Sequence, residues 1–210
     1  MNITTDSIRE FLIDSFDKDI DDLLISDSLL VEFITVDGLD YDGNKLNVDF
    51  SDLKYFKNLR FIEIANTMVN SSLINILSTF NRLENVIFRN CTYSKSLRNF
   101  NKLTNIKCLR VIEANNFDLN YIKDLTTLKR LYISNMDINS LKVLSKLNLD
   151  ALDVSSCNIK RNCFKSLNVK YLVISEDLFN KYTESLLNLD CKVMIMGDES
   201  LGYFISKWIN

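Results

Sequence analysis

Apolar residues recur along the chain in one fixed pattern of long and short spacings. The segment LKRLYISNMDI, residues 128–138, has apolar side chains at its first, fourth, sixth and eleventh positions. The segment LDALDVSSCNI, which begins at residue 149, has the same apolar skeleton and few other side chains in common with it. Side chains at the fourth and sixth positions alternate as in a β-strand, so both enter the core while their neighbours face outwards. The pattern therefore predicts a repeated strand.

Further copies of this skeleton, L-x-x-L-x-L-x-x-(N/C/T)-x-L, cover most of the sequence. Their first positions fall at residues 31, 59, 83, 109, 128, 149 and 169, and a weaker copy contains Val193 and Ile195. Between copies, apolar residues recur in steps of three, which suits a short 3₁₀ or α turn; an example is Leu119, Ile122, Leu125 and Leu128. No repeat can bury its apolar side alone, so neighbouring repeats are expected to stack and share one core.

On these copies the chain resembles the leucine-rich-repeat superfamily over nearly its whole length, since that superfamily has a period of roughly 20–29 residues. The shorter repeats are similar to the class of about 22 residues seen in the regulatory subunits of protein phosphatase 1. The resemblance implies an α/β solenoid, with a curved parallel β-sheet on the concave side and short α or 3₁₀ segments on the convex side. It also implies a recognition module as the default function.

The ninth position of the skeleton, where the superfamily usually has Asn or Cys, is irregular. It holds Thr67, Cys91, Phe117, Met136, Cys157 and Asp177. One place earlier stand Asn66, Asn90, Asn116 and Asn135. Two interpretations remain open: the alignment is shifted by one residue there, or these Asn side chains bond the turn backbone. Cys91 and Cys157 are expected to be buried structural thiols.

The two ends of the array are expected to be capped by helices, because repeat arrays need polar outer ends. Residues 1–28 are predicted as a helical N-terminal cap, residues 29–196 as seven to eight repeats, and residues 197–210 as a capping helix. Ser7 and Glu10 fit a capping box at the first helix. The last helix is predicted from apolar residues at helical spacing, namely Leu201, Phe204, Ile205, Trp208 and Ile209.

Composition indicates a globular protein of a reducing compartment. The 210 residues are 47% hydrophobic and 25% charged, with a net charge of −3, so a nucleic-acid-binding surface is not expected. No apolar run has the length of a membrane helix, and the first residues carry charges throughout. The five cysteines are odd in number and lack C-x-x-C pairs, which favours reduced thiols in the cytoplasm. The abundance of Asn, Lys and Ile, with no Pro or His, is typical of an AT-rich genome.

The same composition argues against catalysis. Without histidine the chain lacks the usual general base and the commonest zinc ligand. Four glycines are too few and too scattered for a phosphate-binding loop. The acidic segment FDKDIDDLL lacks the glycine turn of a calcium loop and is expected to be a solvated face. We therefore expect no catalytic residues, no metal site and no cofactor.

The outward positions three, five and seven of each strand are the candidate binding face. Apolar and aromatic residues are set there among charges, as in protein-recognition surfaces. The candidates are Phe61, Glu63, Ile87, Arg89, Val111, Glu113, Arg130, Tyr132, Asp153, Tyr171 and Val173. The alternative is that these side chains only pack along the strands, with Arg89 or Arg130 paired to acids on neighbouring strands.

The sequence thus predicts a cytoplasmic, monomeric, non-enzymatic scaffold that binds a protein through its concave face. The partner is expected to offer apolar anchors and basic residues that meet Glu63, Glu113 and Asp153. One alternative is a recognition subunit of an enzyme complex, such as a ubiquitin ligase adaptor or a phosphatase regulator. A pathogen or viral effector is another, and a partner bound at the N-terminal cap would favour this group.

Overall fold

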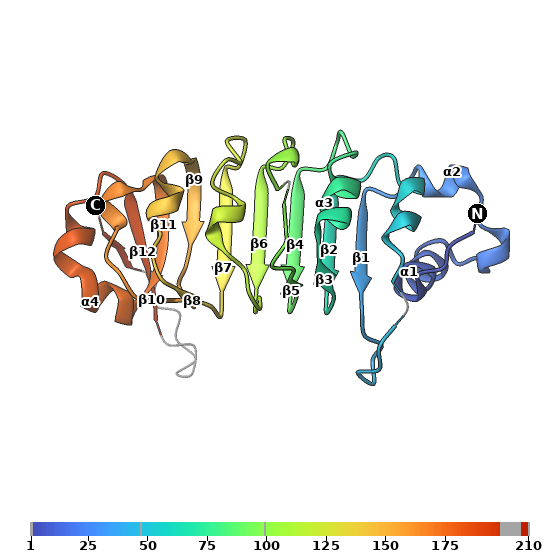
Figure 1. The fold of residues 1–210 in the computed structure, drawn as a ribbon, viewed down its shortest axis with the longest axis horizontal. Helices are drawn as coiled ribbons and strands as arrows, with labels where there is room; N and C mark the ends of the chain where they lie inside the picture. Colours follow the sequence, from blue (N-terminus) through green and yellow to red (C-terminus); the bar gives the residue numbers. More distant parts are fainter. Residues whose placement is uncertain (1, 47, 99, 198–206, 210) are drawn as a thin grey trace. The chain divides into compact units, whose positions relative to one another are not determined.

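A computed structural model describes residues 2–46, 48–98, 100–197 and 207–209 (Figure 1). The chain forms two compact units: a first unit of residues 1–106 with 114–117, and a second unit of residues 107–113 with 118–210. Within each unit the main strands pair in parallel and in sequence order. Short helices and 3₁₀ turns connect them. This arrangement confirms the predicted repeat architecture.

The first unit pairs three main strands and carries two shorter ones. Its sheet contains β1 (Phe33–Asp37), β2 (Phe61–Ala65) and β4 (Asn85–Arg89), and β3 (Met68–Val69) pairs with β5 (Thr92–Tyr93). Its helices are α1 (Asp6–Phe16), α2 (Ile25–Ser28) and α3 (Ser71–Leu77), with 3₁₀ turns η1 (Ile20–Asp22), η2 (Phe50–Tyr55) and η3 (Phe100–Lys102).

The second unit pairs five parallel strands and adds one antiparallel strand. Its sheet contains β6 (Cys108–Ile112), β7 (Arg130–Ser134), β9 (Asn148–Asp153), β11 (Asn168–Ser175), β12 (Lys192–Met196) and the antiparallel β13 (Lys207–Ile209). The remaining elements are β8 (Asp137–Ile138), β10 (Asn158–Ile159), α4 (Glu176–Leu187), η4 (Leu119–Tyr121), η5 (Lys142–Lys146) and η6 (Phe164–Ser166).

Two columns of buried aliphatic residues hold the strands of each unit in register. At position four, Ile34 pairs with Ile62 and Ile62 with Val86, and all three are at most 1% exposed. The second unit continues the same position with Leu109, Leu131, Leu152, Leu172 and Val193, also buried and in register. A shift of one residue in any strand would turn its buried set outwards, so these columns specify the register.

The repeat that contains β6 has a different register from the predicted one. Leu109 pairs with Leu131 and Val111 with Ile133, which places the first position of this repeat at Ile106 and not at Leu109. The segment IKCLRVIEA offers the apolar skeleton in both registers. The observed one buries Val111 completely, whereas the predicted one would have used Ala114, a smaller side chain that is only partly buried.

Asn66, Asn90 and Asn135 stand at the eighth position, where the backbone is left-handed, whereas the corrected register gives this position to Glu113 and moves Asn116 out of it. Asn66, Asn90, Glu113 and Asn135 have φ of 55°, 49°, 52° and 56°. Asn tolerates this conformation better than most residues, because its short side chain bonds locally. Asn66 donates to Asp37 and Asn90 donates to Asn66, both at 2.7 Å, and Asn135 donates to Glu113 at 3.0 Å. The expected bonds to the turn backbone are therefore wrong: these Asn side chains bond side chains of the neighbouring repeat, and their own repeats keep the predicted alignment.

The N-terminal segment is held by a buried aspartate. The Asp52 carboxylate, 2% exposed, accepts hydrogen bonds from the backbone N–H groups of Thr4 and Thr5 at 2.8 and 2.7 Å. The predicted capping box is wrong: Thr5 precedes α1, and Ser7 Oγ instead accepts a bond from the backbone N–H of Asp37 at the end of β1. The first helix is therefore tied directly to the first strand.

The C-terminal helix predicted over residues 197–210 does not exist at Lys207–Ile209, which form β13. These residues pair antiparallel with β12, with Trp208 opposite Met194. Residues 198–206 and 210, and with them Leu201, Phe204 and Ile205, lie outside the described residues. A short apolar stretch at helical spacing also satisfies strand pairing, so spacing alone did not decide between the two.

We predict that Glu113→Asn raises the free energy of unfolding by about 0.5–1 kcal/mol, because Asn occupies the left-handed region at lower cost. Asn135→Glu is the matched control and should lower the stability by a similar amount. Urea unfolding followed by circular dichroism measures both. Equal stability of the wild type and both variants would show that the eighth position does not select Asn for its conformation.

Candidate protein-binding face

We call the outward residues at positions three, five and seven of the main strands the strand face of each unit. In the first unit an aromatic cluster marks one end of this face. The Phe33 ring lies 4.9 Å from Phe61 and 6.1 Å from Phe11 of α1, centroid to centroid. Phe33 is 44% exposed, and Phe61 is partly buried. The cluster offers apolar surface to a partner.

Two opposite charges on the strand face of the first unit neutralise one another. Arg89 Nη2 and Nε both lie 2.8 Å from the same Glu63 carboxylate oxygen on the neighbouring strand. The partly buried Ile87 lies directly opposite Glu63 in the sheet register. Glu63 and Arg89 therefore pair with each other across neighbouring strands. This is the alternative to partner binding that the sequence left open. A half-exposed pair of this kind contributes less than about 1 kcal/mol.

In the second unit the strand face carries tyrosines with cations over their rings. The Arg110 guanidinium lies 4.7 Å from the Tyr132 ring centroid, and Lys192 Nζ lies 5.8 Å from that of Tyr171. Tyr171 is 42% exposed and Arg130 is exposed. Tyrosine and arginine are enriched among the residues that dominate protein interfaces.

Residues paired in the sheet register form two rows across the strand face of the second unit. In one row, Arg130 pairs with Ala151, Ala151 with Tyr171, and Tyr171 with Lys192. In the second row the register joins Arg110, Tyr132, Asp153, Val173 and Met194. The partly buried Val173 and Met194 add apolar surface to one end of the second row.

Of the sequence-predicted residues, Val111 is wrong as a contact because it is buried, and Glu113 and Asp153 have bonds within the chain while their partner contact stays a prediction. Val111 is fully buried in the core, and Glu113 lies in the left-handed turn after β6, where it accepts the bond from Asn135. Asp153 is on the face, but its Oδ1 accepts bonds from the Ser155 N–H and Oγ, at 3.0 and 2.8 Å. The corrected register puts Arg110 where Glu113 was expected, so sequence reasoning missed this cation.

A second exposed apolar surface lies on the N-terminal cap. Leu24, Ile25 and Leu30 are 62%, 60% and 72% exposed, and Leu29 is exposed beside them. Asn58 Nδ2 donates to the carbonyl of Leu29, which ties this segment to the next repeat. We call Leu24, Ile25, Leu29 and Leu30 the cap patch. Exposed aliphatic residues that gather in this way are typical of interaction surfaces.

Cys91 and Cys157, the two cysteines at the ninth position of the skeleton, are buried structural thiols. The Cys91 thiol lies 3.4 Å from the carbonyl oxygen of Ile64, and the Cys157 thiol 3.1 Å from that of Ile133, to which they donate. Burial raises the pKa of Cys91 and raises that of Cys157 to about 12. Burial likewise raises the pKa of the Cys108 thiol, although Arg110 and Arg130 oppose it. A nucleophilic cysteine needs the opposite shift.

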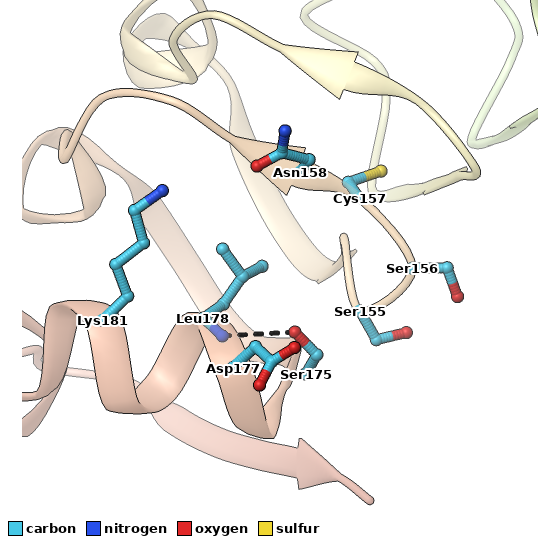
Figure 2. Close-up of a pocket in the computed structure, with 8 residues that line it drawn as sticks. All are labelled: Ser155, Ser156, Cys157, Asn158, Ser175, Asp177, Leu178 and Lys181. Atoms are coloured by element: carbon cyan, nitrogen blue, oxygen red, sulfur yellow. Dashed lines mark hydrogen bonds between the residues drawn. The ribbon is translucent and has the colours of Figure 1, made fainter. Parts of the chain in front are cut away.

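A cleft of about 440 Å³ opens between the turn after β9 and the start of α4 (Figure 2). It is lined by Ser155, Ser156, Cys157, Asn158, Ser175, Asp177, Leu178 and Lys181. Ser175 Oγ accepts the Leu178 N–H at 3.2 Å, and Lys181 Nζ donates to the Ile159 carbonyl at 3.1 Å. The first turn of α4 carries Glu176 and Asp177, which disfavour a bound anion.

Two further properties concern the described residues as a whole. Among them, no three His, Cys, Asp or Glu side chains come together as a metal ion would need. None of their helices combines the length and the apolar character required to cross a bilayer.

The fold is similar to that of known leucine-rich-repeat proteins. Internalin C2 (inlC2) from Listeria monocytogenes str. 4b F2365 aligns with a TM-score of 0.53 and 13% identity, over 82% of this chain and 84% of that one. The internalin inlF from the same strain aligns less well, with a TM-score of 0.42 and 14% identity over 81% and 62%. TLR13, solved as a complex with ssRNA13, aligns with a TM-score of 0.47 and 17% identity, over 73% of this chain and 23% of that one.

Comparison of the sequence with protein-family models and with curated proteins finds no match. The likeness to internalin C2, together with the parallel strand order, confirms the predicted α/β leucine-rich-repeat fold. The finer resemblance to phosphatase regulatory subunits stays a prediction.

We predict that Cys91 and Cys157 react at least about 100-fold more slowly with a disulfide reagent than an unfolded cysteine does, because their thiolates are scarce at pH 8. The measurement uses single-cysteine variants, folded and in urea, with Cys163 as the partly buried control. Rapid labelling of either residue in the folded protein would reveal an activated thiolate and reopen a catalytic role.

Proposed function

We propose that this chain is a non-enzymatic recognition module, which binds a protein partner in the cytoplasm through its strand face. The observation that carries the proposal is the contrast between the two sides of the strands. Residues at positions four and six are buried, while the outward rows expose Phe33, Tyr171 and Arg130. Repeat arrays commonly use such extended strand surfaces for binding.

The exposed side chains also have the composition of an interface. Aromatic rings lie beside charged groups, as in the pairs of Arg110 with Tyr132 and Lys192 with Tyr171. Such a mixture gives apolar contact area together with oriented polar contacts. The cytoplasmic part of the proposal rests on the sequence, in which five cysteines, an odd number without C-x-x-C pairs, favour reduced thiols.

The cap patch favours a second candidate function. A recognition subunit of a larger complex needs one surface for its target and another for the complex. Leu24, Ile25, Leu29 and Leu30 form an apolar surface on the cap, outside the strand face. In this case the chain would act as an adaptor, with the cap bound to the complex and the strand face open to the target.

We expect the double variant Ile87→Asp, Tyr132→Asp to lose a protein that the wild type captures from lysate of the source organism. Each change replaces an apolar or aromatic side chain by a charge, which typically weakens an interface by about 1 kcal/mol or more, about fivefold or more in Kd. Met68→Asp with Leu187→Asp is the matched control, since both residues are exposed but lie outside the strand face.

Circular dichroism and thermal unfolding must first show that all variants fold. A third variant, Leu24→Asp with Leu30→Asp, tests the cap patch. Capture that survives the strand-face changes and disappears with the cap changes would reject strand-face binding and favour the adaptor.

A further inference from the structure

The strand face of the second unit has an excess of positive charge. Its outward residues, together with those at position two beside them, include Lys107, Arg110, Lys129, Arg130, Lys170 and Lys192. The acidic residues at the same positions are Asp150 and Asp153. These positions therefore hold six basic and two acidic side chains, on a chain whose net charge is −3.

Both acids already have partners within the chain. Lys170 Nζ lies 2.6 Å from Asp150 Oδ1, and this hydrogen bond is the main reason that the pKa of Asp150 is lowered. Asp153 accepts its two bonds from Ser155. The two acids are thus held in place, and they cannot balance six cations, although the charges of Lys129 and Arg130 also act on Asp150.

Four of these cations have no salt-bridge partner among the described residues. In the part of the chain that the structure describes, Arg110, Lys129, Arg130 and Lys192 form no salt bridge. Arg110 and Lys192 lie over tyrosine rings instead. A guanidinium has five N–H donors, so Arg110 can contact Tyr132 and Cys108 and still bind a carboxylate in bidentate fashion.

We infer that the strand face of the second unit binds an acidic peptide segment of the protein partner, with carboxylates on Arg110, Arg130 and Lys192 and an apolar or aromatic side chain against Tyr171. The inference rests on the proposed function and gives the partner's chemistry. It reverses the sign expected from the sequence, which was a basic partner for Glu63, Glu113 and Asp153.

The register sets the spacing of the acids in that segment. Arg130 and Lys192 belong to one row and are three strand spacings apart, about 14 Å at about 4.8 Å per strand. An extended peptide advances about 3.4 Å per residue, so two acids four residues apart span the same distance. These acids also lie on one side of the peptide, because side chains alternate along it.

A peptide fits this face better than a nucleic-acid strand. A strand of nucleic acid needs a groove of cations that follows its backbone for several nucleotides. Residues 1–106 contain 16 Asp and Glu against 11 Lys and Arg, so the first unit offers no such excess. The cations of the second unit are few and are separated by Ala151 and Asp153, which suits discrete carboxylates.

The test is a selection of random displayed peptides, about 12 residues long, on the full purified chain. We expect the enriched peptides to carry an excess of Asp and Glu, with two acids about four residues apart. Their affinity should fall about tenfold or more in Arg130→Glu with Lys192→Glu, and it should fall between about 50 and 300 mM NaCl. Lys142→Glu with Lys165→Glu is the control of equal charge change and should bind as the wild type does.

Four other outcomes would overturn the inference. Peptides that lack acids and ignore the charge reversal, but are lost with Tyr132→Ser and Tyr171→Ser, would leave the proposed function standing. Peptides whose affinity is unchanged by every strand-face substitution would contradict both the inference and the proposed function. A selection without any enriched peptide would contradict both as well. A single-stranded oligonucleotide that displaces the acidic peptides and binds more tightly would assign the face to nucleic acid.

Discussion

The burial of the side chains at positions four and six is the constraint on which the structure depends. Each strand contributes two of these residues, such as Leu131 and Ile133 of β7, and a neighbouring strand in register completes their burial. Burying one such side chain contributes about 1.5–3 kcal/mol. This is small beside the cost of ordering a repeat, at about 1–2 kcal/mol per residue for the backbone alone. A repeat is therefore stable only when it stacks on others.

The turn after each strand is the second constraint, and it follows from the first. The chain must reverse direction within a few residues of position six, so that the next apolar stretch can return beneath the sheet. In four repeats a residue with positive φ stands at position eight, and Asn at three of these positions adds a side-chain bond to the neighbouring repeat. Gly38 stands at the corresponding place after β1, where a Cβ atom would collide with the carbonyl oxygen of Asn66. Close stacking of the turns thus selects small or amide side chains.

These two constraints explain which parts of the fold could be predicted from the sequence. The apolar skeleton located most strands, because every strand must bury the same two positions. It gave the wrong register at IKCLRVIEA, because two registers bury aliphatic residues there. The difference between them is the volume of Val111 against Ala114, which only the packed neighbours decide. The end of the chain had no neighbouring copy for comparison, and a helical spacing was predicted where Lys207–Ile209 pair as a strand.

The binding face was less predictable because no constraint of stacking acts on outward residues. Counting residues at outward positions gives the types of side chain present, but not their partners. Glu63 finds Arg89 on the neighbouring strand, and Asp153 finds Ser155 two residues further on.

An acid that is satisfied within the chain attracts a partner weakly, since binding must first replace the existing bonds. The opposite holds for Arg110, whose guanidinium lies over the Tyr132 ring and has no salt-bridge partner among the described residues. The charge that a partner meets is therefore the charge that remains after local pairing. In the second unit this remainder is positive, although the chain as a whole is acidic.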